Sequence, residues 1–461
     1  MLFSIENLKN FGFGVLAVLG LMVMITVHEF GHYIVGKIFK FKINEFAIGM
    51  GPAIYKRTKK NGEVFSVRAL PLGGYCAFEG EDEENPSENA FNNKAPWKRI
   101  LVLLAGATMN YLLALVIIIV STNVYGASTL QSSVVRQSAE YTESLQSGDY
   151  ILSIKNGDKK TDIVLSSDLV SAVNHSKKGD LVYAEIIRNT GEESEYLTVP
   201  VRLREDVECK NLTEVNEVYS ALGIGSAMQI VVRGDESGAL KTGDYIIGYK
   251  TSEESKDYTY IFDYEDFKSL VKDKTAGDKL VFYVYSNGMY TNNPIVLGEA
   301  WESVDKENEK EVLSYFRISS YEYSYYTGGG YLKVGFFRSI PRSINYSVKI
   351  GGTILKTLGE LISGKLGIRS VGGTVTTIVA TTKIIRYGLV YALEIFSFIG
   401  VNLAVFNLLP IPALDGSRIV FCIIEWIRKK PVDRKVEGII HAIGFIFILG
   451  FAVLVDLLQF I

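Results

Sequence analysis

The segment His28-Glu29-Phe30-Gly31-His32 carries the side chains best suited to chemistry in this chain. On a helix, residues four apart share one face, so the imidazoles of His28 and His32 can bind a single metal ion. The carboxylate of Glu29 lies about 100 degrees round the helix, within reach of a metal-bound water whose proton it can take. The spacing therefore predicts a metal-assisted hydrolytic site.

The place of this motif in the chain supports the prediction. A surface helix with two ordinary histidines would show the same letters, but here the motif ends a long apolar run. Ionisable groups within a hydrophobic span cost at least a few kcal/mol each. His28 and Glu29 therefore need a compensating partner, and a metal ion supplies one.

A third ligand must come from elsewhere, because catalytic zinc usually binds three protein groups and a water. The candidate is Asp415, in the segment Asn407–Gly416, which reads NLLPIPALDG. Capping of a following helix is an alternative role for Asp415, and it is compatible with ligation. The other histidines, His175 and His441, have no ligand-like neighbours in the sequence. The three cysteines lie too far apart to indicate a disulfide framework or a cysteine-based metal site.

Four apolar windows must position these residues. Each is long enough to cross a bilayer core, which takes about 20 residues of helix. A soluble enzyme is thereby excluded, and the net charge of −3 gives no sign of a nucleic-acid partner. The first window lacks a basic stretch before it and a cleavage site after it, so we expect it to remain in the mature protein. The windows are Phe11–Val27, Ile100–Ala127, Ile395–Leu414 and Gly438–Val455.

Lysine and arginine gather in the two short loops that join these spans, between residues 37 and 99 and between residues 418 and 435. By the positive-inside rule, both loops are cytoplasmic. The N-terminus, the C-terminus and the long middle segment are then extracytoplasmic. His28, His32 and Asp415 come to a similar depth, near the cytoplasmic side.

The middle segment contains a weak internal repeat. Ser147-Gly148-Asp149-Tyr150-Ile151 recurs as Thr242-Gly243-Asp244-Tyr245-Ile246, and each copy continues through a short helix, a second Gly-Asp turn and a strand. This order resembles the PDZ domains attached to bacterial proteases. The resemblance implies peptide-binding modules that add an extended segment to a sheet edge. A spacer with occluded grooves is the alternative.

HEFGH in the first span together with NLLPIPALDG in a late span resembles the site-2 protease family of intramembrane zinc metalloproteases. The PDZ-like copies between them resemble the RseP-type bacterial branch of that family. The resemblance implies one zinc ion per chain, held by His28, His32 and Asp415, with Glu29 as the general base. It also implies that Asn407 holds the substrate or the reaction's oxyanion. The other substrate-binding residues that it implies are Gly49, Gly51, Gly73, Gly74, Tyr75, Pro410 and Pro412.

Two segments depart from the family's pattern. Ser417 stands where the family often has a glycine, and Ser370-Val371-Gly372-Gly373 replaces a G-P-x-G-type motif. Neither departure touches a proposed ligand. Around residues 335–385, basic side chains among Ile, Leu and Phe indicate amphipathic helices on the outer leaflet, although a plain soluble helix would show the same pattern.

These features predict a multi-span α-helical membrane protein of about four transmembrane helices, with an inserted extracytoplasmic α+β block of two PDZ-like domains. The resemblance places it in the plasma membrane of a bacterium. The expected parts are residues 1–127, with the first two transmembrane helices, HEFGH and a cytoplasmic β-hairpin loop; 128–205 and 206–320, the two PDZ-like domains; 321–385, an amphipathic membrane-surface region; and 386–461, the last two transmembrane helices with NLLPIPALDG.

The expected activity is that of a zinc metalloendopeptidase in regulated intramembrane proteolysis. It would hydrolyse a peptide bond in the transmembrane segment of single-span membrane proteins, such as anti-sigma factors or remnant signal peptides. The bilayer and these substrates are the expected partners, with a peptide or substrate ectodomain at the PDZ-like block and no nucleic acid. Because a helix hides its carbonyl groups in hydrogen bonds, the substrate must unwind before cleavage.

Two other functions remain open on the sequence. One is a catalytically inactive membrane scaffold with tandem PDZ modules, and the other is a metal-dependent transporter. The intact Glu29 argues against the scaffold, because a structural metal site has no use for a base. The small number of spans argues against the transporter, which usually shows inverted repeats.

Overall fold

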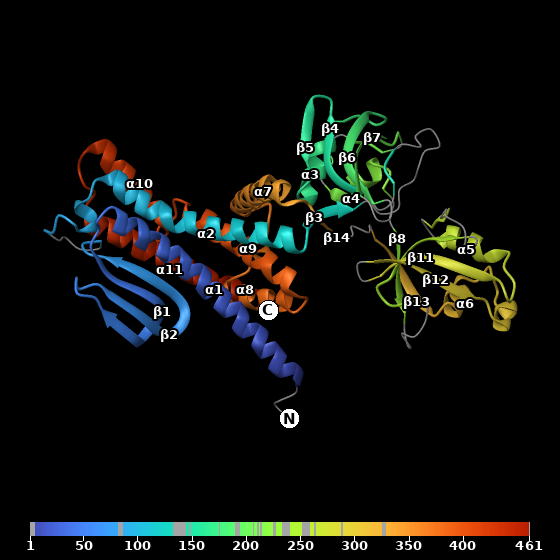
Figure 1. The fold of residues 1–461 in the computed structure, drawn as a ribbon, viewed down its shortest axis with the longest axis horizontal. Coiled ribbons are helices and arrows are strands. Elements are labelled where there is room, and N and C mark those ends of the chain that lie inside the picture. The colour runs from blue at the N-terminus through green and yellow to red at the C-terminus, as the bar shows by residue number, and fades with distance from the viewer. Residues whose placement is uncertain are drawn as a thin grey trace. The chain divides into compact units, whose positions relative to one another are not determined.

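The computed structural model divides into two compact units, Met1–Tyr125 with Val334–Ile461, and Gly126–Lys333 (Figure 1). Ser147, Gly148 and His175, which the sequence singled out, lie outside the described residues. The structure describes residues 5–81, 86–131, 144–146, 149–174, 176–189, 194–205, 207–209, 212, 214–224, 227–232, 240–250, 259–261, 264–286, 289–324 and 329–460.

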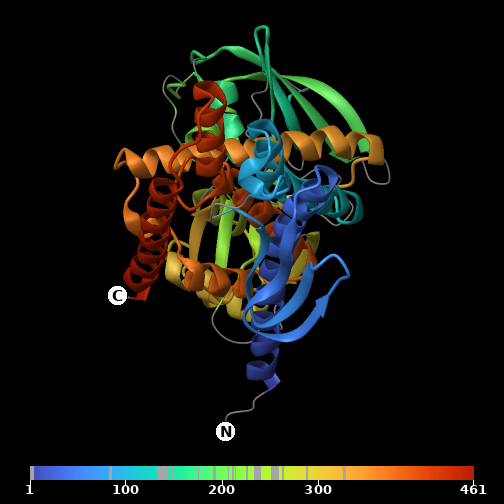
Figure 2. The same ribbon diagram turned by 90° about the vertical axis from the view of Figure 1, so that its left-hand side faces the viewer.

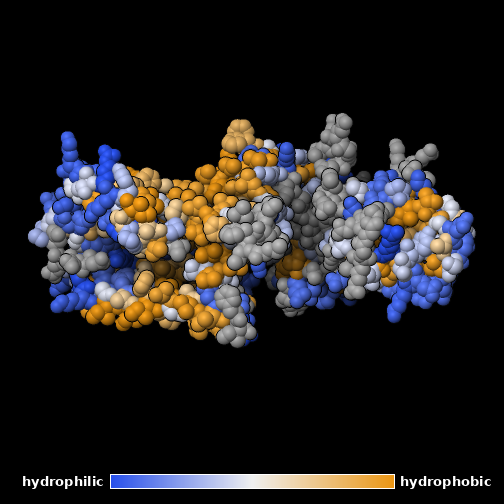
Figure 3. Space-filling view, turned by 90° about the horizontal axis from the view of Figure 1, so that it is seen from below, coloured by the Kyte–Doolittle hydropathy of each residue, from blue (hydrophilic) through white to orange (hydrophobic). Residues whose placement is uncertain are grey.

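The first unit is mainly helical, and four of its described helices are long and apolar enough to cross a membrane. They confirm the spans expected from the sequence. Figure 3 shows a broad hydrophobic band over this unit, with hydrophilic side chains at its left-hand end. The protein therefore belongs in a membrane. The helices are α1 (Ile5–Ile38), α2 (Pro96–Val124), α9 (Leu389–Asn407) and α11 (Arg434–Phe460).

Helix α2 is the centre of this unit, because α1, α9 and α10 (Asp415–Arg428) all pack against it. Small residues let these helices approach closely, as is usual in membranes. A Cβ atom on Gly31 of α1 would lie 2.4 Å from the carbonyl oxygen of Ala105 on α2. A Cβ atom on Gly400 of α9 would lie 2.9 Å from the Cβ of Ala114. Substitution at either glycine would push the helices apart.

A bent β-ribbon follows α1, formed by β1 (Ile43–Thr58) and β2 (Val64–Phe78). Residues 45–48 of β1 pair with residues 74–77 and also with residues 64–67 of β2, so they lie between two parts of that strand. Gly49, with φ of +83°, makes the bend possible, because a Cβ atom there would lie 2.6 Å from the carbonyl oxygen of Leu70. On the outer edge of residues 74–78, the backbone N–H groups of Cys76 and Phe78 donate hydrogen bonds to the carboxylates of Glu29 and Glu81.

Buried Glu63 fastens the ribbon to α1. Its carboxylate accepts hydrogen bonds from the hydroxyl of Tyr33 at 2.8 Å and from Lys59 Nζ at 2.7 Å, and it pairs with Lys37. Burial opposes ionisation of Glu63, but the hydrogen bonds from Lys37 and Lys59 outweigh it and lower its pKa to about 2. The ribbon is therefore held in place against α1 rather than hanging from it.

Two helices of the first unit, α7 (Phe336–Ile362) and α8 (Thr374–Ile385), precede α9 in the chain. Helix α7 runs across the other helices of its unit in Figure 2 and packs on α2 and α9. Buried serines at positions four apart make this contact, and Ser347 Oγ lies 2.8 Å from the hydroxyl of Tyr111 on α2. Apolar side chains on α7, including Phe337 and Val348, are exposed. This is the amphipathic pattern expected from the sequence, and contact with lipid on that face stays a prediction.

The second unit contains two sheets of the same strand order. The first reads β14-β3-β4-β6-β7 with β5 beside β4, and the second reads β13-β8-β9-β11-β12 with β10 beside β9 (Figure 1). The internal repeat read from the sequence is thus a repeat of topology. The strands of the first sheet are β3 (Ala127–Gln131), β4 (Tyr150–Asn156), β5 (Lys159–Asp162), β6 (Leu181–Asn189), β7 (Ser194–Arg202) and β14 (Gly329–Leu332); those of the second are β8 (Ala227–Val232), β9 (Tyr245–Lys250), β10 (Thr259–Tyr260), β11 (Lys279–Ser286), β12 (Met289–Val296) and β13 (Ile318–Ser324).

The second copy is inserted into the first in the chain. Strand β14, which follows the whole second sheet, pairs with β3 and completes the first sheet. It falls in the range 321–385 that the sequence assigned to the membrane surface. Leu212 and the apolar residues between Val218 and Ile224 likewise pack in the core of the first sheet, beyond the expected boundary at 205. The short helices of this unit are α3 (Ser166–Val173), α4 (Val215–Ala221), α5 (Tyr264–Lys272) and α6 (Glu309–Tyr315).

Candidate metal centre

Three side chains from two distant parts of the chain, helix α1 and the start of α10, meet beside α2. Asp415 Oδ2 lies 3.0 Å from His28 Nε2 and 3.4 Å from His32 Nε2, and the two nitrogens are 3.1 Å apart. Both histidines are buried. Among the described residues, this is the group of histidine and acidic side chains that could hold a metal ion.

The size and chemistry of this group fit zinc. Zinc binds imidazole nitrogen and carboxylate oxygen at about 2.0–2.1 Å, so neighbouring ligand atoms of a tetrahedral site lie about 3.3 Å apart. His32 Nδ1 lies 2.8 Å from the carbonyl oxygen of Val102, which can only accept, so Nδ1 carries the hydrogen. The Nε2 of a neutral His32 then presents a lone pair to the centre. Three such atoms in one small triangle match the three protein ligands of a catalytic zinc site.

Asp415 is brought to the centre by a tight turn before α10. It is the first residue of that helix, and Leu414 is at the N-cap position, so the capping role considered for Asp415 is not the one it takes. A Cβ atom on Gly416 would lie 2.3 Å from the carbonyl oxygen of Leu409, which explains the glycine.

Helix α11 also contacts the turn before α10 and supports it. Ala413 has φ of +78°, a left-handed conformation that costs a non-glycine residue roughly 1–3 kcal/mol. Its N–H donates a 3.1 Å hydrogen bond to His441 Nδ1 on α11. One turn further along α11, Gly444 lies so close to Pro412 that a Cβ atom would come within 2.3 Å. His441, which had no evident partner in the sequence, thus holds the strained residue two positions before Asp415.

Glu29 points to the β-ribbon and is not part of the triangle. Its Oε2 accepts a 3.1 Å hydrogen bond from the backbone N–H of Cys76, on the outer edge of β2. Gly74, nearby on the same strand, would bring a Cβ atom within 3.6 Å of Glu29 Cγ. The edge of the sheet therefore runs directly past the carboxylate expected to act as the base.

The other residues predicted to bind substrate take different positions. Asn407, at the end of α9, reaches the centre, with its Nδ2 3.5 Å from His28 Nδ1. Tyr75 lies next to Gly74 on β2, and its ring stacks with the guanidinium of Arg68 at 5.2 Å. The remaining residues shape the backbone: Gly49 and Gly51 in the bend of β1 against Leu70, Gly73 against Met50, and Pro410 and Pro412 in the turn before α10.

Three contributors were missed by reading the sequence. They are the carbonyl of Val102, the amide of Asn110 and the imidazole of His441, which contact His32, His28 and Ala413. Asn110 carried a usable signal, because a polar residue in the middle of an apolar span is rare and usually functional. His441 carried the same signal near the start of the last span. No local pattern marks a particular carbonyl such as that of Val102.

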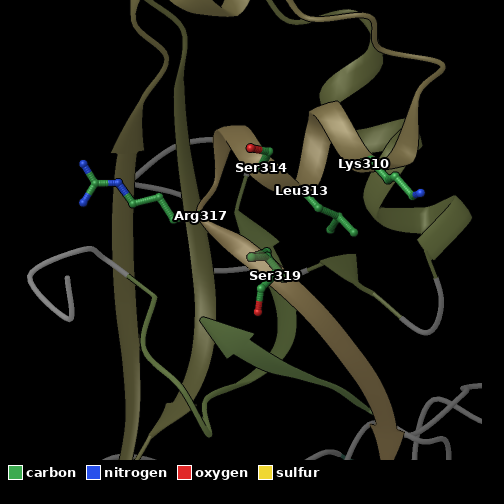
Figure 4. A pocket seen from close by; sticks show the side chains of 6 residues that line it. Lys310, Leu313, Ser314, Arg317 and Ser319 are labelled. Carbon is green, nitrogen blue, oxygen red and sulfur yellow. The ribbon is translucent and has the colours of Figure 1, made fainter. Parts of the chain in front are cut away.

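A separate hollow of about 420 Å³ lies in the second sheet's domain, between α6 and the start of β13. Figure 4 shows Lys310 and Arg317 at its margin with their charged ends pointing apart, and Leu313 between them. It shares no residue with the metal centre. Two divergent cations beside one leucine give it no evident chemistry.

Residues 16–451 match the family model described as Peptidase family M50, and this range includes the triangle of ligands and Glu29. The regulator of sigma E protease of Haemophilus influenzae is 26% identical over 456 residues, covering 95% of this chain and 96% of the relative. The regulator of sigma-E protease RseP of Escherichia coli is 25% identical over 460 residues, 94% of each. A relative from Thermotoga maritima, whose name contains the words zinc metalloprotease, is 28% identical over 487 residues, 92% of this chain and 94% of its own.

Proposed function

The chain belongs to peptidase family M50, and we propose that His28, His32 and Asp415 hold its zinc ion, one per chain, with Glu29 as the general base. It is an intramembrane zinc metalloprotease, as its family and the names of its relatives indicate. The observation that carries the residue assignment is the convergence of three ligand atoms within 4.8 Å of one another. The carboxylate of Glu29 stands beside them without joining them.

The roles of the side chains follow from their contacts. Bound zinc would supply Lewis-acid activation of the scissile carbonyl and of the attacking water. The N–H of Cys76 holds Oε2 of Glu29, which leaves Oε1 to accept the water's proton and pass it to the leaving amine. Asn407, half-buried at the end of α9, has an amide that can donate to the substrate's carbonyl oxygen.

The substrate's backbone would lie along the outer edge of residues 74–78, where the N–H groups of Cys76 and Phe78 stay on Glu29 and Glu81. The inner edge of this strand already pairs with β1, and the Cys76 N–H on the outer edge points to Glu29. A segment added to that edge would be extended, with its peptide groups beside the base. A transmembrane helix must unwind to bind there, so small or helix-breaking residues near the cleavage site should favour cleavage.

The substrates we propose are single-span membrane proteins, including anti-sigma factors and remnant signal peptides. The names of two relatives refer to regulation of a sigma factor, which supports a regulatory substrate. The two sheets of like topology are proposed to be PDZ-like domains that contact a substrate's outer domain or a peptide. From the distribution of basic residues, we place this block and both termini outside the plasma membrane of a bacterium, with the metal centre near the cytoplasmic side.

The test is cleavage of a single-span substrate by the purified full chain in proteoliposomes, combined with metal analysis. Glu29→Gln should keep about one zinc per chain and lose about 10²- to 10⁴-fold in rate. His28→Ala and Asp415→Ala should lose both zinc and cleavage. Glu88→Gln, at an exposed carboxylate, is the matched control and should change neither. Full zinc in Asp415→Ala would show that the third ligand is misassigned, and cleavage at the normal rate by Glu29→Gln would remove Glu29 as the base.

A further inference from the structure

Helix α2 presents three consecutive turns to the two histidines. Val102, Gly106 and Asn110 are spaced four residues apart, so they lie along one face of the helix. Val102 supplies a carbonyl oxygen to His32 Nδ1. Gly106 supplies space, because a Cβ atom there would lie 2.4 Å from His32 Nε2 and 2.7 Å from His28 Cε1. The third residue on this face, Asn110, reaches His28.

Asn110 is fully buried, and one of its side-chain polar atoms is unsatisfied. Its Nδ2 lies 3.4 Å from His28 Nδ1, and its Oδ1 has no hydrogen-bond partner among the described residues. A buried acceptor without a donor costs about 1–3 kcal/mol. The two ends of an amide have nearly the same shape, so a half-turn of the side chain exchanges them without moving other atoms.

The proton on His28 decides which end should face it. His28 Nε2 points to Asp415, and as a metal ligand it must present a lone pair. Nδ1 of a neutral His28 then carries the hydrogen and needs an acceptor, which Nδ2 of Asn110 cannot be. With Oδ1 turned to His28, the orphaned oxygen and the imidazole N–H satisfy each other.

Resting on the proposed zinc site, we propose that Asn110 is a positioning residue that accepts a hydrogen bond from His28 Nδ1–H and fixes the imidazole for zinc binding. Together with the Val102 carbonyl, it makes one face of α2 the support for both histidines. Such supporting partners of metal-bound histidines typically contribute 10- to 100-fold in metal affinity or activity.

Asn407 is the competing candidate, since its Nδ2 lies 3.5 Å from the same His28 atom. It is half-buried at a helix end, so it can turn to a substrate, whereas Asn110 is enclosed and contacts only His28 through hydrogen-bond geometry among the described residues. The two asparagines therefore have different roles. Asn110 acts on zinc binding, and Asn407 acts on substrate.

The test measures zinc affinity of the full chain in detergent by competition with a chelator, without any substrate. Asn110→Leu, which removes the acceptor, should weaken zinc binding about 10- to 100-fold. Asn110→Asp keeps an acceptor and should bind zinc at least as tightly as wild type. Asn407→Leu is the matched control and should bind zinc normally while losing cleavage. Unchanged zinc affinity in Asn110→Leu, or equal weakening in Asn110→Asp and Asn110→Leu, would overturn the proposal.

A second measurement uses the wild-type protein, so it tests the proposal even if Asn110→Leu does not fold. The chain has four histidines, so the imidazole ¹⁵N resonances of the wild-type zinc protein are few enough to assign. His28 should show a protonated, hydrogen-bonded Nδ1, and a deprotonated Nδ1 would overturn the proposal. A different result would refute the proposed zinc site. Retention of zinc by His28→Ala or Asp415→Ala would show that these residues do not bind it. Loss of zinc in those variants with normal binding in Asn110→Leu removes only the role of Asn110.

Discussion

Replacing Glu425 by Gln should loosen α10 much more than replacing Arg99 by Met, although both changes break the same ion pair. Arg99, near the start of α2, is 1% exposed, and its Nη2 lies 2.5 Å from Oε1 of Glu425 on α10. Glu425 has a second cation within 3.4 Å, Arg434 at the start of α11. The pair is therefore unequal, because only the glutamate has another partner of opposite charge among these three.

The expected magnitudes follow from that inequality. Glu425→Gln leaves the guanidinium of Arg99 buried beside a neutral side chain, a change that typically costs about 3–5 kcal/mol. Arg99→Met removes the buried charge, fills the space with an apolar chain and leaves Glu425 with Arg434. That change should cost only about 1–2 kcal/mol.

Cys422, buried on α10, provides the assay. With Cys76 and Cys209 replaced by Ala, the rate at which a thiol reagent labels Cys422 reports the opening of this helix. Since 1.4 kcal/mol is tenfold, labelling should accelerate about 100- to 4000-fold in Glu425→Gln and about 5- to 30-fold in Arg99→Met. Glu88→Gln should label at the wild-type rate. Equal acceleration in the two variants, or a greater one in Arg99→Met, would refute the reasoning.

Three further predictions concern the turn before Asp415, the β-ribbon and the membrane topology. His441→Leu removes the acceptor for the Ala413 N–H and should raise the zinc dissociation constant about fivefold, whereas His441→Asn keeps an acceptor and should stay nearer wild type; chelator competition measures both. The lowered pKa of Glu63 means that its contribution to stability is complete above pH 4.5 and is lost as pH falls towards 2, so thermal unfolding of Glu63→Gln should lack this acid-dependent part. Cysteines at Lys60 or Lys430 should react with an impermeant maleimide only after lysis, and one at Lys310 should react on cells with an opened outer envelope.

The membrane spans and the residues of the candidate metal centre could be proposed from the sequence because each depends on local information. A window such as Ile100–Ala127 is apolar whatever surrounds it in the folded protein. The structure has a helix long enough to cross a membrane at each of the four windows. HEFGH places His28 and His32 on one face of a helix through their spacing alone. Asp415 was chosen because it directly follows the apolar window Ile395–Leu414, at a depth similar to that of the two histidines, and the structure brings its carboxylate to both of them.

The remaining parts depend on how distant segments pack. The role of Asn110 requires that α2 turn one face towards α1, which is set by the contact of Gly31 with Ala105. The insertion of one β-domain in the other depends on pairing of β14 with β3, across about 200 residues of chain. The Gly-Asp turns showed that there are two copies, but they carry no information on which strand completes each sheet.

The arrangement also implies that metal binding and chemistry can be disturbed separately. The histidines are held by α2, Asp415 by α11 through Ala413, and Glu29 by the edge of β2 through Cys76. The first two supports act on ligand atoms, so their loss should appear as weaker zinc binding. The third acts on the base and on the strand where substrate would pair, so changes there should lower cleavage with zinc retained. A site assembled from three such supports depends on the packing of α1, α2, α11 and the ribbon, and not on the two motifs alone.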